Sequence, residues 1–261
     1  MAAHRDPAAR RSAARAWERL PPDERSALLS DPEAEVRRAA ALRECRRDAH
    51  VTVALLRDPE SAAEALRHGL LHRADAERCL AGRTHLAGLA GNPSLPADLV
   101  ERLAVDPDGA VRLAVSLRPE LDETRRTAID VTVGAFATVD VAWVRDGLAE
   151  PEVLRRAAAS VHPLLRGAAA RSPHLSPELV SLLARTEDPF VEDLLGVHHP
   201  DTPEEVLMRV FARIGGTFSA WMAQSHPRFP RGGLAARYAA RPDGHCRRLA
   251  VRDPAASPAL I

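Results

Sequence analysis

The sequence predicts an all-α protein, a right-handed α-α superhelix (solenoid) of about nine two-helix repeats of 24–27 residues. Prolines recur at intervals of 27 residues, at Pro173, Pro200, Pro227 and Pro254. After these prolines, apolar residues recur at helical spacing. Aromatic residues make up only 3% of the chain, so Ala, Leu and Val must fill the core, which suits closely packed helices.

The first helix of a repeat is clearest after the stretch Asn92-Pro93-Ser94-Leu95-Pro96. Leu99, Val100, Leu103 and Ala104 then share one helical face, which predicts a buried stripe. The second proline of the stretch suits a helix start, where no backbone donor is needed.

A second proline corner precedes the other helix of each repeat, as in Asp106-Pro107 before Val111 and Arg112. Related corners follow the same pattern at Pro32, Pro163, Pro189 and Pro242. Helices of about two turns are marginal alone in water, so stacked neighbours must stabilise them.

Residues 1–20 are predicted to form an N-terminal capping helix, and residues 21–261 the solenoid. Ala13, Trp17 and Leu20 would line one face of the cap. The arginines of this segment also allow a basic arm for nucleic acid or membrane. We favour the cap, because a solenoid needs a polar outer face at its ends.

Residues 131–150 depart from the repeat pattern. The β-branched residues between Val131 and Val141 predict an extended loop or a short hairpin where a second helix is expected. We expect an irregular insertion here, a lengthened connection rather than a dedicated binding element.

Composition excludes several kinds of protein. Net charge is zero, and all 36 basic residues are Arg, so lysine-dependent phosphate loops and Schiff bases are excluded. A neutral balance argues against a main role in holding nucleic acid phosphates. Cys45, Cys79 and Cys246 are odd in number and far apart, which favours the reducing cytoplasm. The sequence has no apolar run of 18 residues, so we expect no membrane association.

The two corner motifs, Asn92 to Pro96 and Asp106 to Arg112, together with their repeats, resemble the leucine-rich repeat variant family of HEAT-like α-solenoids. The resemblance covers about residues 20–261 and implies an α-helix paired with a short or 3₁₀ helix. Some members carry an N-terminal cysteine cluster for an iron–sulfur centre. Cys45 and Cys79 form no such cluster, so we expect no cofactor.

Four arginines occupy one position of the repeat, and Glu192 interrupts their row. The row consists of Arg37, Arg112, Arg166 and Arg247. In one interpretation their guanidinium groups form a stripe that binds phosphate or carboxylate. In the other, which the HEAT-like resemblance implies and which we favour, they form an Asp–Arg ladder between stacked repeats.

Trp143 and Trp221 are the tryptophans outside the cap, and Asp140 and Asp146 lie near Trp143. HEAT-like DNA glycosylases resemble this architecture and use tryptophans with an acidic residue. Cradling a modified base normally needs more aromatic residues and positive charge than this chain carries. We therefore favour tryptophans that belong to the core.

The histidines have simple interpretations. His68 and His72 are four residues apart and could face one metal ion, but the sequence offers no evident third ligand, so no metal site is predicted. His199 and His226 lie at repeat corners, where polar capping accounts for them.

The sequence carries no catalytic motif, and no catalytic residue is assigned. It predicts a non-enzymatic scaffold that binds a protein or peptide partner on its concave face. The alternative is a HEAT-like DNA-binding protein or a DNA-repair glycosylase acting on alkylated bases.

Overall fold

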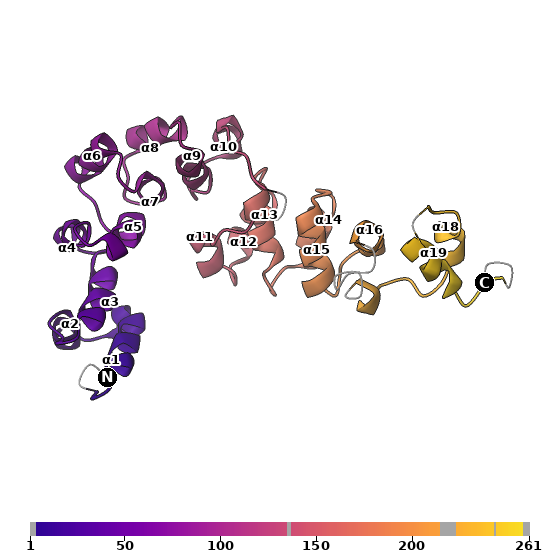
Figure 1. The fold of residues 1–261 in the computed structure, drawn as a ribbon, viewed down its shortest axis with the longest axis horizontal. Coiled ribbons are helices and arrows are strands. Elements are labelled where there is room, and N and C mark those ends of the chain that lie inside the picture. Colours follow the sequence, from indigo (N-terminus) through magenta and orange to yellow (C-terminus); the bar gives the residue numbers. More distant parts are fainter. Residues whose placement is uncertain (1–3, 135–136, 215–222, 243, 258–261) are drawn as a thin grey trace. The chain divides into compact units, whose positions relative to one another are not determined.

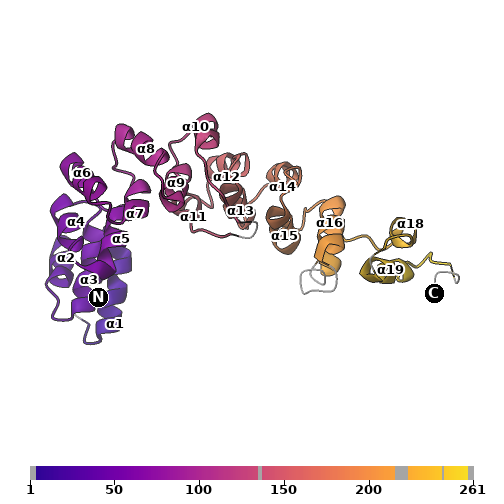
Figure 2. The same ribbon diagram turned by 45° about the horizontal axis from the view of Figure 1, so that its top comes forward.

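The computed structural model describes all residues except 1–3, 135–136, 215–222, 243 and 258–261. Within those described residues all regular secondary structure is helical, as Figures 1 and 2 show. The predicted all-α class is confirmed. None of the described helices has the length and apolar character needed to cross a membrane.

The chain forms two compact units, Met1–Thr132 and Val133–Ile261, which divide inside the predicted insertion. The helices of the first unit are α1 (Pro7–Ala13), the 3₁₀ helix η1 (Ala14–Arg19), α2 (Pro22–Leu29), α3 (Ala34–Glu44), α4 (Ala49–Leu55), α5 (Pro59–His68), α6 (Arg73–Gly82), α7 (Leu86–Ala90), α8 (Ala97–Ala104), α9 (Gly109–Ser116) and α10 (Glu123–Ala128). The helices of the second unit are α11 (Ala142–Asp146), α12 (Pro151–Ala158), α13 (Pro163–Ala170), α14 (Pro177–Ala184), α15 (Pro189–His198), α16 (Glu204–Ile214), α18 (Leu234–Tyr238) and α19 (Gly244–Val251).

Most helix starts follow simple chemistry. An aspartate side chain accepts a backbone N–H at the N-cap of several helices, as Asp108 does from Ala110 at 2.8 Å. Proline occupies the first turn of others, including α13 and α14. At α14 the preceding Ser176 adds a cap by accepting from the N–H of Leu179.

Helices pack against near neighbours in chain order. In the first unit α3, α5, α7 and α9 each contact the next member of that series, as can be followed in Figure 1. In the second unit α11, α13 and α15 do the same, and α12 contacts α14. Each helix also packs against its partner in a pair, as α8 does with α9 and α12 with α13.

The core consists of small aliphatic side chains, as the composition predicts. Leu99, Leu103, Val111 and Val115 are fully buried in a cluster that spans α5 to α9. Val100 is buried and Ala104 partly buried, so the stripe predicted for this helix is confirmed. Burying such side chains is the main source of stability available to short helices.

At several of the proline corners, a buried polar residue precedes the proline and bonds to a backbone carbonyl oxygen 23–29 residues earlier in the chain. Asn92 Nδ2 donates to the carbonyl oxygens of Leu66 at 2.5 Å and Gly69 at 2.8 Å. The other members of this series are Arg118 to Ala90 O and Asn92 O, Ser172 to Leu148 O, His199 to Ala170 O and His226 to His199 O. These bonds satisfy carbonyl groups that helix ends leave without partners.

The N-terminal segment contains two helical elements where the sequence predicted one. Ala16 has φ −96° and ψ 22°, which ends regular helix geometry between α1 and Trp17. Ala13 and Trp17 are buried and Leu20 is partly buried against the same cluster, so the predicted apolar face is present. The Trp17 indole donates to Glu44 at 2.9 Å, which anchors η1 on α3.

Within the predicted insertion, residues 131–150, the described residues 131–134 and 137–141 have no helix and no strand, whereas Ala142–Asp146 form α11 and end the irregular segment. The expected loop is therefore present, while the alternative of a hairpin has no support among these residues. Val141 is buried and leads into α11.

Candidate functional site

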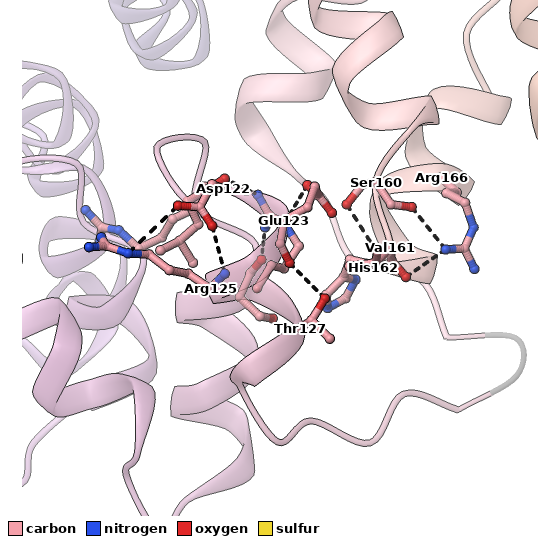
Figure 3. A network of polar contacts seen from close by, with 12 residues as sticks. Asp122, Glu123, Arg125, Thr127, Ser160, Val161, His162 and Arg166 are labelled. Carbon is pink, nitrogen blue, oxygen red and sulfur yellow. Dashed lines mark hydrogen bonds and ion pairs between the residues drawn. The ribbon is translucent and has the colours of Figure 1, made fainter.

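Each arginine of the predicted row bonds to its own backbone corner. Arg166 Nη1 donates to the carbonyl oxygens of Ser160 at 3.1 Å and Val161 at 2.7 Å, six and five residues earlier (Figure 3). The same pair of bonds is made by Arg37 to Asp31 O and Pro32 O, by Arg112 to Asp106 O and Pro107 O, and by Arg247 to Arg241 O and Pro242 O. In all four cases one guanidinium nitrogen therefore donates to two carbonyl oxygens of the turn that precedes its helix.

Two aspartates, which lie six residues before Arg37 and Arg112, pair with arginines from earlier in the chain. Asp31 accepts from Arg10 at 2.6 and 2.9 Å, and Asp106 from Arg83 at 2.9 and 3.1 Å. The hydrogen bond from Arg10 holds the pKa of Asp31 below its ordinary value, and Arg83 does the same for Asp106. Arg166 also reaches Asp188 at 3.0 Å. These pairs join consecutive repeats within each unit.

In α15 the position that the four arginines occupy elsewhere is held by Glu192, so the charge at this position is negative instead of positive. Its side chain is buried, and two arginines of α16 supply the positive groups. Arg209 Nε donates to one carboxylate oxygen at 2.5 Å, and Arg213 Nη1 to the other at 2.7 Å. Arg209 also donates to Ala184 O and Arg213 to Pro189 O, so guanidinium groups again bind backbone carbonyls here.

Trp143 lies half-buried at α11, with the Arg156 guanidinium 4.4 Å from its ring centroid. Asp140 and Asp146 both pair with Arg145, so both acidic residues have a cationic partner. Trp221 lies outside the described residues. The surroundings of Trp143 show a ring covered by a cation, which is a common way to pack a partly exposed tryptophan.

His68 and His72 do not share a helix, because α5 ends at His68 and His72 is the N-cap of α6. In the part of the chain that the structure describes, no three His, Cys, Asp or Glu side chains gather closely enough to hold a metal ion. Cys45, Cys79 and Cys246 are buried and form no disulfide with one another. Burial raises the pKa of the Cys45 thiol to about 11, which keeps it protonated and unreactive.

A basic cleft lies between η1 and the C-terminal end of α3. We define it by Arg15, Arg19, Arg43 and Arg46. An open cavity of about 620 Å³ is lined by all four, and an adjoining one of about 270 Å³ shares Arg15, Arg43 and Arg46. Arg15, Arg19 and Arg46 are exposed, while Arg43 is half-buried.

Sequence reasoning identified the arginines of residues 1–20 but not their neighbours Arg43, in the last turn of α3, and Arg46, just after its end. Arg43 and Arg46 are three residues apart, a spacing that places two side chains on one helical face. That signal was available, but only the contact between η1 and α3 brings the two pairs of arginines together.

Comparisons with models of protein families, with curated proteins and with solved structures found no match for this chain. Membership of the leucine-rich repeat variant family therefore stays a prediction. The functional conclusions rest on the contacts of the chain itself.

Proposed function

We propose that the chain is a cytoplasmic α-solenoid of the leucine-rich repeat variant type, and that it acts as a non-enzymatic scaffold for a protein or peptide partner. The near-neighbour packing of α3, α5, α7 and α9 supports the solenoid, because stacked repeats contact mainly their neighbours. Three buried cysteines that form no disulfide with one another suit a reducing compartment. The partner would bind on the concave face of the solenoid.

The proposal is supported chiefly by the polar side chains at the proline corners, which bind backbone carbonyl oxygens of the chain itself. Arg37, Arg112, Arg166 and Arg247 all bind backbone carbonyls of their own corners. The buried residues before the prolines bind carbonyls of the preceding repeat. These polar groups are used to hold the helices together. Binding would therefore fall to other residues on the solvent-exposed surface, which suits recognition of another macromolecule.

The alternative is a DNA-binding protein or a glycosylase acting on alkylated bases. The basic cleft favours it, because unpaired arginines attract phosphates. The surroundings of Trp143 count against the glycosylase, because Asp140 and Asp146 are both engaged by Arg145. A catalytic carboxylate would have to leave that partner first.

Affinity capture with the full chain, followed by reconstitution with the purified candidate, tests the proposal. We expect one protein to be retained in stoichiometric amounts and to bind the purified chain saturably in calorimetry. Failure of any captured protein to bind the purified chain would overturn the scaffold. A shift of duplex DNA at about 50 mM salt, abolished at about 200 mM, would instead support the alternative.

A further inference from the structure

We propose that the basic cleft binds an acidic segment of a partner polypeptide, one that carries several Asp or Glu side chains close together. The proposal rests on the proposed scaffold function and names the chemistry of its partner. It depends on the four arginines, on the carboxylates around them and on the shape of the cavities.

The four arginines of the cleft stand apart from most others in the first unit. Among the residues that the structure describes, the side chains of Arg15, Arg19, Arg43 and Arg46 make no ion pair and no hydrogen bond. Nearby arginines are paired, namely Arg10 with Asp31, Arg11 with Glu35, Arg38 with Asp58 and Glu60, and Arg47 with Glu18. Four unpaired guanidinium groups in one cleft form a local excess of positive charge in a neutral chain.

The carboxylates around the cleft are already engaged. Glu18 pairs with Arg47, and Glu35 with Arg11. Glu44 accepts from the indole of Trp17 at 2.9 Å, and Glu64 lies 3.4 Å from the imidazole of His68. These acids therefore pair with groups other than Arg15, Arg19, Arg43 and Arg46, and these four arginines are left to meet a ligand.

The cavities have a size that suits side chains of a peptide. The volumes of about 620 and 270 Å³ adjoin at Ser12, Arg15, Arg43 and Arg46, and both are open to solvent. A guanidinium group binds a carboxylate through two parallel hydrogen bonds, so each arginine can engage one acidic side chain. A short stretch of peptide can thus place carboxylates against several arginines at once.

A peptide fits this cleft better than a nucleic acid or a membrane. Trp17 is only 2% exposed, so the cleft offers no aromatic surface on which a base could stack. Glu18 lines the larger cavity and Glu64 the smaller one, so the positive stretch between them is short and matches a short acidic segment better than a long phosphate backbone. Over the described residues 4–47 no large hydrophobic side chain is exposed that could insert into lipid.

The test uses the full chain and a fluorescent peptide in which Asp and Glu alternate with Gly and Ser. Binding is followed by fluorescence anisotropy at about 50 and 300 mM salt. The cleft variant is R15Q/R19Q/R46Q, which changes only exposed side chains that make no hydrogen bond or ion pair with the described residues and so should fold normally. The matched control, R102Q/R185Q/R248Q, removes the same charge from exposed arginines elsewhere.

We expect the wild-type chain and the control variant to bind the peptide alike, more weakly at the higher salt. The cleft variant should bind about tenfold more weakly, as expected for losing several exposed charge pairs. Equal affinity of the two variants, or no binding by the wild-type chain, would overturn the proposal. So would single-stranded DNA of matched charge that binds more tightly than the peptide and depends on the same three arginines.

The two proposals can fail separately. If the wild-type chain binds the acidic peptide but retains no partner protein, the scaffold function fails and the cleft assignment stands. If a captured partner binds the cleft variant as well as the wild-type chain, the cleft assignment fails and the scaffold stands.

Discussion

His226 donates a hydrogen bond from Nε2 to the carbonyl oxygen of His199 at 2.8 Å, across 27 residues. His199 in turn donates from Nε2 to the carbonyl oxygen of Ala170 at 2.8 Å. Asn92 makes the same kind of bond in the first unit, to Gly69 O. At these three sites a buried side chain therefore bonds to a carbonyl oxygen 23–29 residues earlier in the chain.

The His199 bond makes the second unit sensitive to acid. Burial lowers the pKa of His199 below its ordinary value of 6.5, against a smaller raising effect of its bond to Ala170. The unfolded chain then binds a proton at a higher pH than the folded chain does. His199 thus favours folding fully above about pH 6.5, and this contribution is lost as the pH falls towards its folded pKa.

We expect the second unit to unfold at a lower temperature at about pH 5 than at about pH 7.5. Circular dichroism during heating, with H199N as the comparison, measures this difference. Asn fills the same position in the first unit as Asn92, so it can donate to Ala170 without titrating. If H199N keeps the full acid sensitivity of the wild-type chain, His199 is not its source.

Arg166→Ala should destabilise the second unit by about 2 kcal/mol, because it leaves two carbonyl oxygens of the corner without their donor. A larger loss is not expected, because the substitution also removes the buried Nε of Arg166, which has no hydrogen-bond partner in the described chain. Urea unfolding measures the loss. Arg185→Ala is the control, because the side chain of Arg185 is exposed and makes no hydrogen bond or ion pair with the described residues, and it should change stability by less than about 0.5 kcal/mol. Equal effects of the two changes would contradict a structural role for the row.

Glu192→Ala should cost about 2–3 kcal/mol, because it leaves Arg209 and Arg213 without the carboxylate that both bind. The full cost of breaking a buried pair is not expected, since these arginines are 42% and 31% exposed and water can solvate them. Chemical denaturation measures the change, with the exposed Glu205→Ala as the control. A loss no larger than that of the control would show that the charge reversal at this position is incidental.

Most of the structure that could be predicted from the sequence follows from patterns among residues close together in the chain. The proline corners, the paired helices and the buried stripe of Leu99 and Leu103 follow from rules that act within a few residues, and the structure has them. The break at Ala16 was not predicted, because Ala and Arg on both sides are good helix formers. The next residue, Trp17, is buried and bonds to Glu44, 27 residues away, a contact that no local rule predicts.

Long-range hydrogen bonds were the part that sequence could not supply. His199 and His226 were interpreted as local caps, and His226 does accept the N–H of Arg228 through Nδ1. Its other ring nitrogen reaches His199 O, a partner that no local rule identifies. The basic cleft was missed for the same reason, since Arg15 and Arg43 meet only when η1 packs against α3.

Gly88 is the site where close helix packing can be tested most directly. It lies buried in α7, and a Cβ atom there would be 2.9 Å from the carbonyl oxygen of Ala63 in α5 and 3.5 Å from Leu66 Cβ. Alanine favours a helix by about 1 kcal/mol over glycine, whereas overpacking costs about 1–3 kcal/mol. Because the obstacle is backbone, the clash should dominate.

Gly88→Ala should therefore destabilise the first unit by about 1 kcal/mol, measured by urea unfolding at unchanged m-value. Gly109→Ala is the matched control, because its Cβ would meet only the flexible end of Arg112 at 3.8 Å, and it should be neutral or stabilising. The thiol of Cys79, buried in the core cluster that also holds Leu66 and Leu89, gives a second readout. Faster labelling of Cys79 in G88A than in G109A would place the strain between α5 and α7, while equal stability of both variants would mean that the helices can separate without cost.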